Sequence, residues 1–161
     1  MFIVRLATPD DAEGILHAHH SAVHETAKKD YSQAILNVWS GPVDAQRIAA
    51  HRTKLQADKG VISFVAVEES GKILGFTELV FPDELRAMYI ASSAGRLGVA
   101  SSLYKILESK ARELGMKQLK IVSSLTAAPF YVKQGFRELS RGVHVLSARL
   151  PMACVHMEKK L

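Results

Sequence analysis

The stretch that most constrains the fold runs from position 85 to 114, where an apolar run gives way to a glycine-bearing loop and then to helical periodicity. The apolar run ends at Ser92 and Ser93, as a strand does at a loop. Gly95 and Gly98 lie in the loop. Apolar residues then recur at helical spacing, namely Val99, Leu103, Ile106, Leu107, Ala111 and Leu114. The segment therefore predicts a strand, a short loop and a helix in that order.

Such a loop is a candidate anion site. The first backbone N–H groups of a helix lack partners, and the helix dipole is positive at that end. Gly95 and Gly98 would let a phosphate approach the main chain, and Arg96 could add a charged donor. No Gly-Lys-Ser/Thr follows, which excludes a Walker loop, and the third glycine of the dinucleotide fingerprint is missing.

The loop resembles the pyrophosphate loop of the GNAT superfamily of acetyl-CoA-dependent N-acetyltransferases. In that family a strand ends in an aromatic and an aliphatic residue, and Gln/Arg-x-x-Gly-x-Gly/Ala opens a helix. Here Tyr89-Ile90 ends the strand, and Gly98-Val99-Ala100 follows at the family's distance. The sequence departs from the pattern at Gly95, where Gln or Arg is usual, and at Ser92, which replaces a common proline. Arg96 stands one place after the expected polar residue.

A second segment strengthens the resemblance. Residues 127–136, Ala-Ala-Pro-Phe-Tyr-Val-Lys-Gln-Gly-Phe, match the family's Ala-x-x-x-Tyr-x-Lys-x-Gly-Phe signature at every fixed position. They follow a predicted strand around Leu119 and Ile121, at the family's distance from the first motif. Both motifs in order, spanning Leu85 to Phe136, identify the chain as resembling a GNAT protein.

The pattern along the chain predicts an α/β fold with a mixed, mostly antiparallel sheet of about seven strands and about four to five helices. Because a helix joins them, the strands before and after residues 99–114 should be parallel neighbours. The resemblance implies that this parallel pair splays apart. Expected strands are 2–6, 61–68, 72–81, 85–90, 118–122, 137–146 and 152–158; expected helices begin at Thr8-Pro9, Ser32, Val43 and Gly98.

The chain's size and composition indicate one domain over residues 1–161. No run approaches a membrane helix, the start predicts a strand rather than a secretory leader, and the one cysteine excludes an internal disulfide. We therefore expect a cytoplasmic protein that makes no membrane contact. The net charge of +5 comes from scattered basic residues without interleaved aromatics, so we expect no nucleic-acid partner. A homodimer is left open.

The resemblance implies acetyl-CoA as co-substrate and no metal. The strand would hold the thioester with main-chain groups, and the loop and helix start would hold the pyrophosphate. The cofactor-binding residues it implies are Met88, Tyr89, Ile90, Gly95, Arg96, Leu97, Gly98, Val99, Ala100, Ser101, Phe130 and Lys133.

Acetyl transfer to an amine needs a proton for the departing thiolate and a base for the ammonium. Tyr131 matches the family's catalytic tyrosine, and a phenol of pKa ~10 can protonate a thiolate. The alternative is that its ring only packs on the cofactor sulfur. The base is expected to be Glu78, on the strand beside the cofactor strand, with Glu84 and His24 as rivals. Cys154 has no His or Asp at a spacing that would activate it as a nucleophile, and we interpret it as a core residue.

For the amine acceptor, the resemblance places the helices between the first two strands along one wall of the pocket. His24, Tyr31 and Trp39 are therefore candidate acceptor-binding residues, and the alternative interpretation of Trp39, which the residues favour, is a core position. His17, His20 and His24 share a helix face, but no third ligand accompanies His20 and His24, so we interpret them as solvated or pocket-edge side chains.

The sequence thus predicts an N-acetyltransferase that moves an acetyl group from acetyl-CoA directly to a primary amine of a small molecule or protein, through a ternary complex. Two alternatives stay open. One is a non-catalytic module that binds or senses acyl-CoA, and the other is an acyltransferase that uses a longer acyl group.

Overall fold

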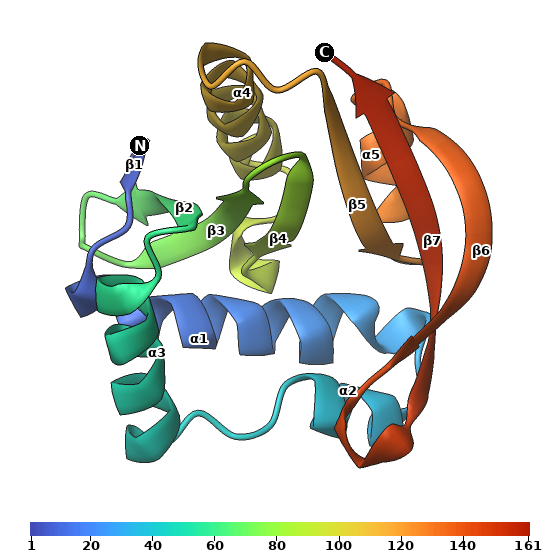
Figure 1. Ribbon diagram of the computed structural model, residues 1–161. Helices are drawn as coiled ribbons and strands as arrows, with labels where there is room; N and C mark the ends of the chain where they lie inside the picture. The colour runs from blue at the N-terminus through green and yellow to red at the C-terminus, as the bar shows by residue number, and fades with distance from the viewer.

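A computed structural model describes all residues 1–161, and its seven strands form one sheet in the order β1-β2-β3-β4-β5-β7-β6 (Figure 1). Neighbouring strands are antiparallel except β4 and β5, which are parallel. This confirms the predicted fold class. The strands are β1 (Phe2–Leu6), β2 (Val61–Glu68), β3 (Ile73–Val80), β4 (Glu84–Ile90), β5 (Gln118–Ser124), β6 (Arg137–Val145) and β7 (Pro151–Lys160).

The chain has five α-helices, and the first four lie close to the predicted positions. They are α1 (Ala12–Ser21), α2 (Gln33–Trp39), α3 (Ala45–Ala57), α4 (Val99–Glu113) and α5 (Ala128–Lys133). The predicted first helix is less regular than expected, since a 3-10 turn precedes α1 and a π-helical turn over Ala22–Thr26 follows it. No helix of the chain is both long enough and apolar enough to cross a bilayer.

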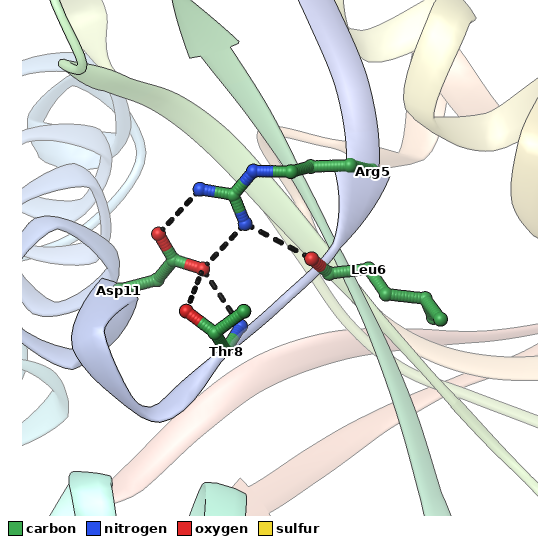
Figure 2. A network of polar contacts seen from close by, with 4 residues as sticks. All are labelled: Arg5, Leu6, Thr8 and Asp11. Carbon is green, nitrogen blue, oxygen red and sulfur yellow. Dashed lines mark hydrogen bonds and ion pairs between the residues drawn. The ribbon is translucent and has the colours of Figure 1, made fainter.

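A polar network fixes the junction between β1 and α1 (Figure 2). The two Arg5 Nη atoms donate to the two Asp11 carboxylate oxygens at 2.7 and 2.8 Å, and the Thr8 N–H donates to Asp11 Oδ2 at 2.7 Å. Although burial opposes it, hydrogen bonding to Arg5 and Thr8 lowers the pKa of Asp11. Thr8 is the N-cap, as predicted, and the carboxylate three residues on satisfies the backbone of that cap.

The two faces of β3 pack against two layers of the core. Leu74 faces α4, where it packs with Val99 and Leu103, whereas Ile73 and Phe76 face α1. Strict alternation is broken here because Ala66 pairs with Gly75 but Val67 pairs with Ile73, so Leu74 is one extra residue in β3. A larger apolar cluster joins α4 and α5 to β5 and β7. Both faces of β3 are covered, which explains why its residues are almost all buried.

The sheet opens between its parallel strands. On the β3 side, Glu78 pairs with Ala87 but Leu79 pairs with Leu85, so Arg86 is one extra residue in β4. Such a bulge bends its strand. On the other side, β4 and β5 share a single paired position, after which they diverge (Figure 1). The splay that the resemblance implied is therefore present.

Candidate functional site

The start of α4 leaves backbone donors free. Gly98 is the N-cap residue with φ +79°, and no side chain caps this helix end. A Cβ on Gly98 would meet no protein atom within 4 Å, so the glycine is required by its backbone angle and leaves open space above the helix start. Arg96 also has a positive φ, of 66°, and its exposed side chain takes no part in the ion pairs that engage other arginines. This arrangement suits an anion.

Ser92, which stands where the family pattern has proline, anchors the loop to the first helical segment. Its N–H donates to Ser21 Oγ at 3.0 Å, and its hydroxyl donates to Glu25 Oε2 at 2.5 Å. Burial has little effect on Glu25, whereas these serine hydrogen bonds lower its pKa. The loop is thereby held against the segment that follows α1.

The edge of β4 beside the opening carries unused peptide groups. Ala91 N donates to Leu74 O at 2.9 Å, so in this antiparallel ladder Ala91 and Tyr89 direct their backbone groups toward β3. Met88 and Ile90 alternate with them and direct theirs toward β5. Because β5 pairs with β4 only at Glu84, these groups have no ladder partner and are free to bind a ligand in the opening.

A cavity of about 350 Å³ lies in this opening and continues over the surface of β5 and β7. It brings together Met88, Tyr89, Tyr131 and Trp39 of the predicted residues. Its full lining is Trp39, Glu84, Arg86, Ala87, Met88, Tyr89, Ile121, Val122, Ser123, Ser124, Ala127, Tyr131, His144, Leu146, Met152 and Cys154.

Tyr131, in α5, lines the cavity with 1% of its surface exposed. Phe130 and Phe136 pack edge-on against its ring, each with a centroid distance of 5.4 Å. Burial raises the pKa of Tyr131 well above its ordinary value, so the phenol keeps its proton at neutral pH. A protonated hydroxyl in an apolar cavity can donate a hydrogen bond to a ligand.

Glu78 lies elsewhere. It is the cross-strand neighbour of cavity-lining Ala87, but its own carboxylate lines a second cavity, beside α3, and faces Lys54 Nζ at 3.6 Å. With 4% of its surface exposed it is a buried acid paired with a half-exposed cation. Its role as general base stays a prediction.

The three candidate acceptor residues occupy different surroundings. Trp39 lines the cavity and donates from Nε1 to the Tyr89 hydroxyl at 3.1 Å. Tyr31 is buried, donates to Ala153 O and accepts from Leu125 N, both at 2.7 Å, and supports Trp39 from behind. His24 bonds through Nε2 to Ser40 O at 2.7 Å and does not line the cavity.

The remaining cofactor candidates cluster around the two motifs. Val99 is buried and can offer only its backbone, whereas Leu97 and Ser101 are exposed at the helix start. Phe130 packs between Tyr104 and Tyr131, and Lys133 is exposed at the end of α5. No group of three or more His, Cys, Asp or Glu side chains could hold a metal, and the rings of His20 and His24 simply stack with centroids 4.1 Å apart.

Sequence reasoning missed His19. Its ring packs edge-on against Tyr89, with centroids 4.3 Å apart, and Nδ1 lies 3.3 Å from Ser40 Oγ. Burial, helped by the positive charge of Arg47 and neighbouring histidines, lowers the pKa of His19 to about 4. Only its helical spacing from Ile15 and Leu16 hinted at burial. His19 is therefore a neutral packing residue behind the cavity wall.

Two further residues of the cavity wall came from the C-terminal strands. His144 lies on β6, whose alternation gave no sign of a site. Cys154 is buried, as expected, but it also lines the cavity, and its Sγ lies 3.8 Å from His156 Nε2. The i, i+2 spacing of Cys154 and His156 on one strand could have suggested this neighbour.

The chain thus forms a mixed sheet that opens between two parallel strands, with the uncapped backbone donors of the α4 start beside the opening. A family model described as an acetyltransferase (GNAT) domain matches residues 27–161. The chain therefore belongs to the GNAT acetyltransferase family, whose members are acyltransferases, as the two motifs indicated.

Solved structures share the fold over nearly the whole chain. A GCN5-related N-acetyltransferase from Rhodopseudomonas palustris matches with a TM-score of 0.87 at 24% identity, covering 99% of this chain and 95% of that one. PaiA N-acetyltransferase from Thermoplasma acidophilum, in complex with coenzyme A, matches at 0.76 and 17% identity over 100% and 99%. A ribosomal-protein-alanine N-acetyltransferase from Brucella melitensis matches at 0.72 and 22% identity over 99% of each chain.

Proposed function

We propose that this protein transfers an acetyl group from acetyl-CoA directly to a primary amine, with Tyr131 as the general acid. The observation that carries the proposal is the position of the Tyr131 phenol in the same cavity as the free edge of β4. An acyl carbon held at that edge would lie within reach of both a peptide N–H and a protonated hydroxyl.

The pyrophosphate of acetyl-CoA would bind at the start of α4, where the N–H groups from Val99 onward lack side-chain caps. Arg96, exposed beside them, would supply a charge-assisted contact. The pantetheine arm would then run between β4 and β5 and pair with the backbone of Met88 and Ile90. The coenzyme A complex of the PaiA protein, which has the same fold, supports a ligand of this kind.

The reaction forms one bond and breaks one. The amine nitrogen attacks the thioester carbonyl carbon, and an N–H of β4, at Met88, stabilises the oxygen that becomes negative. The C–S bond then breaks and the thiolate takes the proton of Tyr131. The proton that the amine loses goes to a base or to water. The assignment of Glu78 as that base stays a prediction. Its carboxylate faces Lys54 in the second cavity and does not line the cavity that holds Tyr131.

Two measurements test the proposal: the change in Tm on adding acetyl-CoA, and the release of coenzyme A during turnover. Acetyl-CoA at ~100 times its Kd should stabilise the fold by about 2.7 kcal/mol and so raise Tm. Coenzyme A should then be released in the presence of a panel of amines. Equal stabilisation by ATP, which lacks the pantetheine arm, would overturn the cofactor assignment. Stabilisation without release from any amine would favour a binding module instead.

A further inference from the structure

We propose that the acceptor is a small monoamine with an apolar body, rather than a polyamine or other acceptor that carries a second positive charge. This inference rests on the proposed function, because it names the substrate class of the same site. It follows from the charges of the cavity beyond the opening between β4 and β5.

The part of the cavity beyond that opening is mostly apolar. Its floor is formed by β5 and β7, and Val122 on this floor is 52% exposed although β5 is an interior strand. An uncovered apolar side chain in the middle of a sheet marks a surface that a ligand can cover. Its other side chains here are Trp39, Ser124, His144, Leu146, Met152 and Cys154.

The aromatic wall of this region is preorganised. The Trp39 indole is fixed by its hydrogen bond to the Tyr89 hydroxyl, and Tyr31 packs edge-on behind it with a centroid distance of 5.5 Å. Burial raises the pKa of Tyr89 to about 12, so this hydroxyl stays neutral. A rigid wall of neutral rings favours an alkyl or aryl body over a strongly hydrated one.

A second ammonium would find no free carboxylate. Glu84 is the one carboxylate that lines the cavity, and it lies 3.9 Å from the guanidinium of Arg86. The acids at the charged end of the same floor are also paired, Asp83 with Lys120 at 2.9 Å and Glu158 with Arg137 at 2.5 Å. His144, which also lines the cavity, has no carboxylate to offer.

The energetic consequence is a preference against dications. A second ammonium in this region would lose water and find only aromatic, apolar or already paired neighbours. A cation–π contact with Trp39 would replace only part of the lost hydration, which is unfavourable. An alkyl chain of the same length would instead cover Val122 and Leu146 and gain from burial. The region thus favours a monoamine over a diamine because it offers no negative charge to compensate a second ammonium.

Trp39 gives a direct readout, since it is the one tryptophan of the chain and lines the cavity. The experiment titrates the protein, in the presence of coenzyme A, with 1-hexylamine and with 1,6-diaminohexane, and follows indole fluorescence. The two probes have the same length and differ by one ammonium. We expect hexylamine to bind with a Kd lower by about tenfold or more. A diamine that binds as tightly or more tightly, or the absence of any fluorescence change with both probes, would overturn the proposal.

A matched pair of variants locates the effect. Val122→Glu places a carboxylate on the floor, and Val143→Glu makes the same change at a 58% exposed valine outside the cavity. The first should shift the Kd ratio toward the diamine by about tenfold and the second should leave it unchanged. An unaltered ratio in Val122→Glu, with its melting curve showing a folded protein, contradicts the placement. Binding without acetylation would instead count against the proposed function alone.

Discussion

Glu84 of β4 and Lys120 of β5 form the single paired position between the two parallel strands. Two further contacts hold the strands together beside this pair. Lys120 N donates to Asp83 O at 2.7 Å, and Lys120 Nζ pairs with the Asp83 carboxylate at 2.9 Å. Two residues later, the bulge at Arg86 turns β4 away. The two strands are therefore paired at Glu84 and diverge beyond it, and the unpaired backbone of Met88 faces the cavity.

The first prediction concerns Gly98. Because its φ is +79° and its missing Cβ leaves open space, Gly98→Val should cost about 1–3 kcal/mol of unfolding free energy and also abolish the rise in Tm with acetyl-CoA. Gly115, at the other end of α4 with φ +74° and equally open surroundings, is the control. Gly115→Val should lose similar stability but keep the ligand shift. Loss of the shift in both variants would mean that strain, and not the phosphate site, is responsible.

Arg96 gives the second prediction. If its guanidinium binds the pyrophosphate, Arg96→Ala should weaken acetyl-CoA binding by about 1.5–3 kcal/mol, the range for a hydrogen bond to a charged group. Isothermal titration calorimetry measures this directly. The same variant should bind S-acetyl-pantetheine, which lacks the phosphates, as the native protein does. An unchanged Kd for acetyl-CoA would leave Arg96 without a role in the site.

The third prediction uses the buried His19. Its folded pKa of about 4 lies below the unfolded value of ~6.5, so the unfolded chain binds the extra proton between these values. The neutral ring therefore contributes stability above pH ~6.5 that is lost as pH falls toward 4, by about 3 kcal/mol at most. Urea unfolding of the native protein and of His19→Asn, compared from pH 7.5 to 4, should show their difference shrinking. Parallel pH curves would contradict the burial of a neutral His19.

Much of the fold followed from local patterns. The helical spacing from Val99 to Ala111 predicted α4, and the two motifs predicted the loop before it and the site residue Tyr131. Glycines at helix starts and ends, such as Gly98 and Gly115, fixed boundaries because positive φ favours that residue. The parallel pair followed from the crossover helix.

The acceptor region could not be predicted in the same way. The C-terminal strands reach the cavity because β7 and β6 lie next to β5 in the sheet. They bring four residues into the same cavity as Trp39, namely His144, Leu146, Met152 and Cys154. No short-range spacing in the sequence predicts that these residues share a cavity with Trp39. The bulge at Arg86 was hidden because the residues after it, Ala87 and Met88, are both apolar, so the alternation of β4 does not reveal which faces the cavity.

The position of Glu78 shows a further limit. Alternation placed it on one face with Phe76 and Val80, and the structure puts it on the α1 and α3 side, near the cavity wall but facing Lys54. Which neighbour a buried carboxylate turns to depends on a side chain from a distant helix. A period-two pattern carries no information on that choice.

Tyr131 supports the central claim, and one kinetic comparison tests it most directly. Tyr131→Phe removes the hydroxyl and keeps the ring between Phe130 and Phe136. With an accepted amine, and under conditions where chemistry limits the rate, kcat should fall by about 10²–10⁴-fold while the Kd for acetyl-CoA stays near the native value. Native turnover in Tyr131→Phe would contradict the account, and with it the assignment of Tyr131 as the acid that protonates the leaving thiolate.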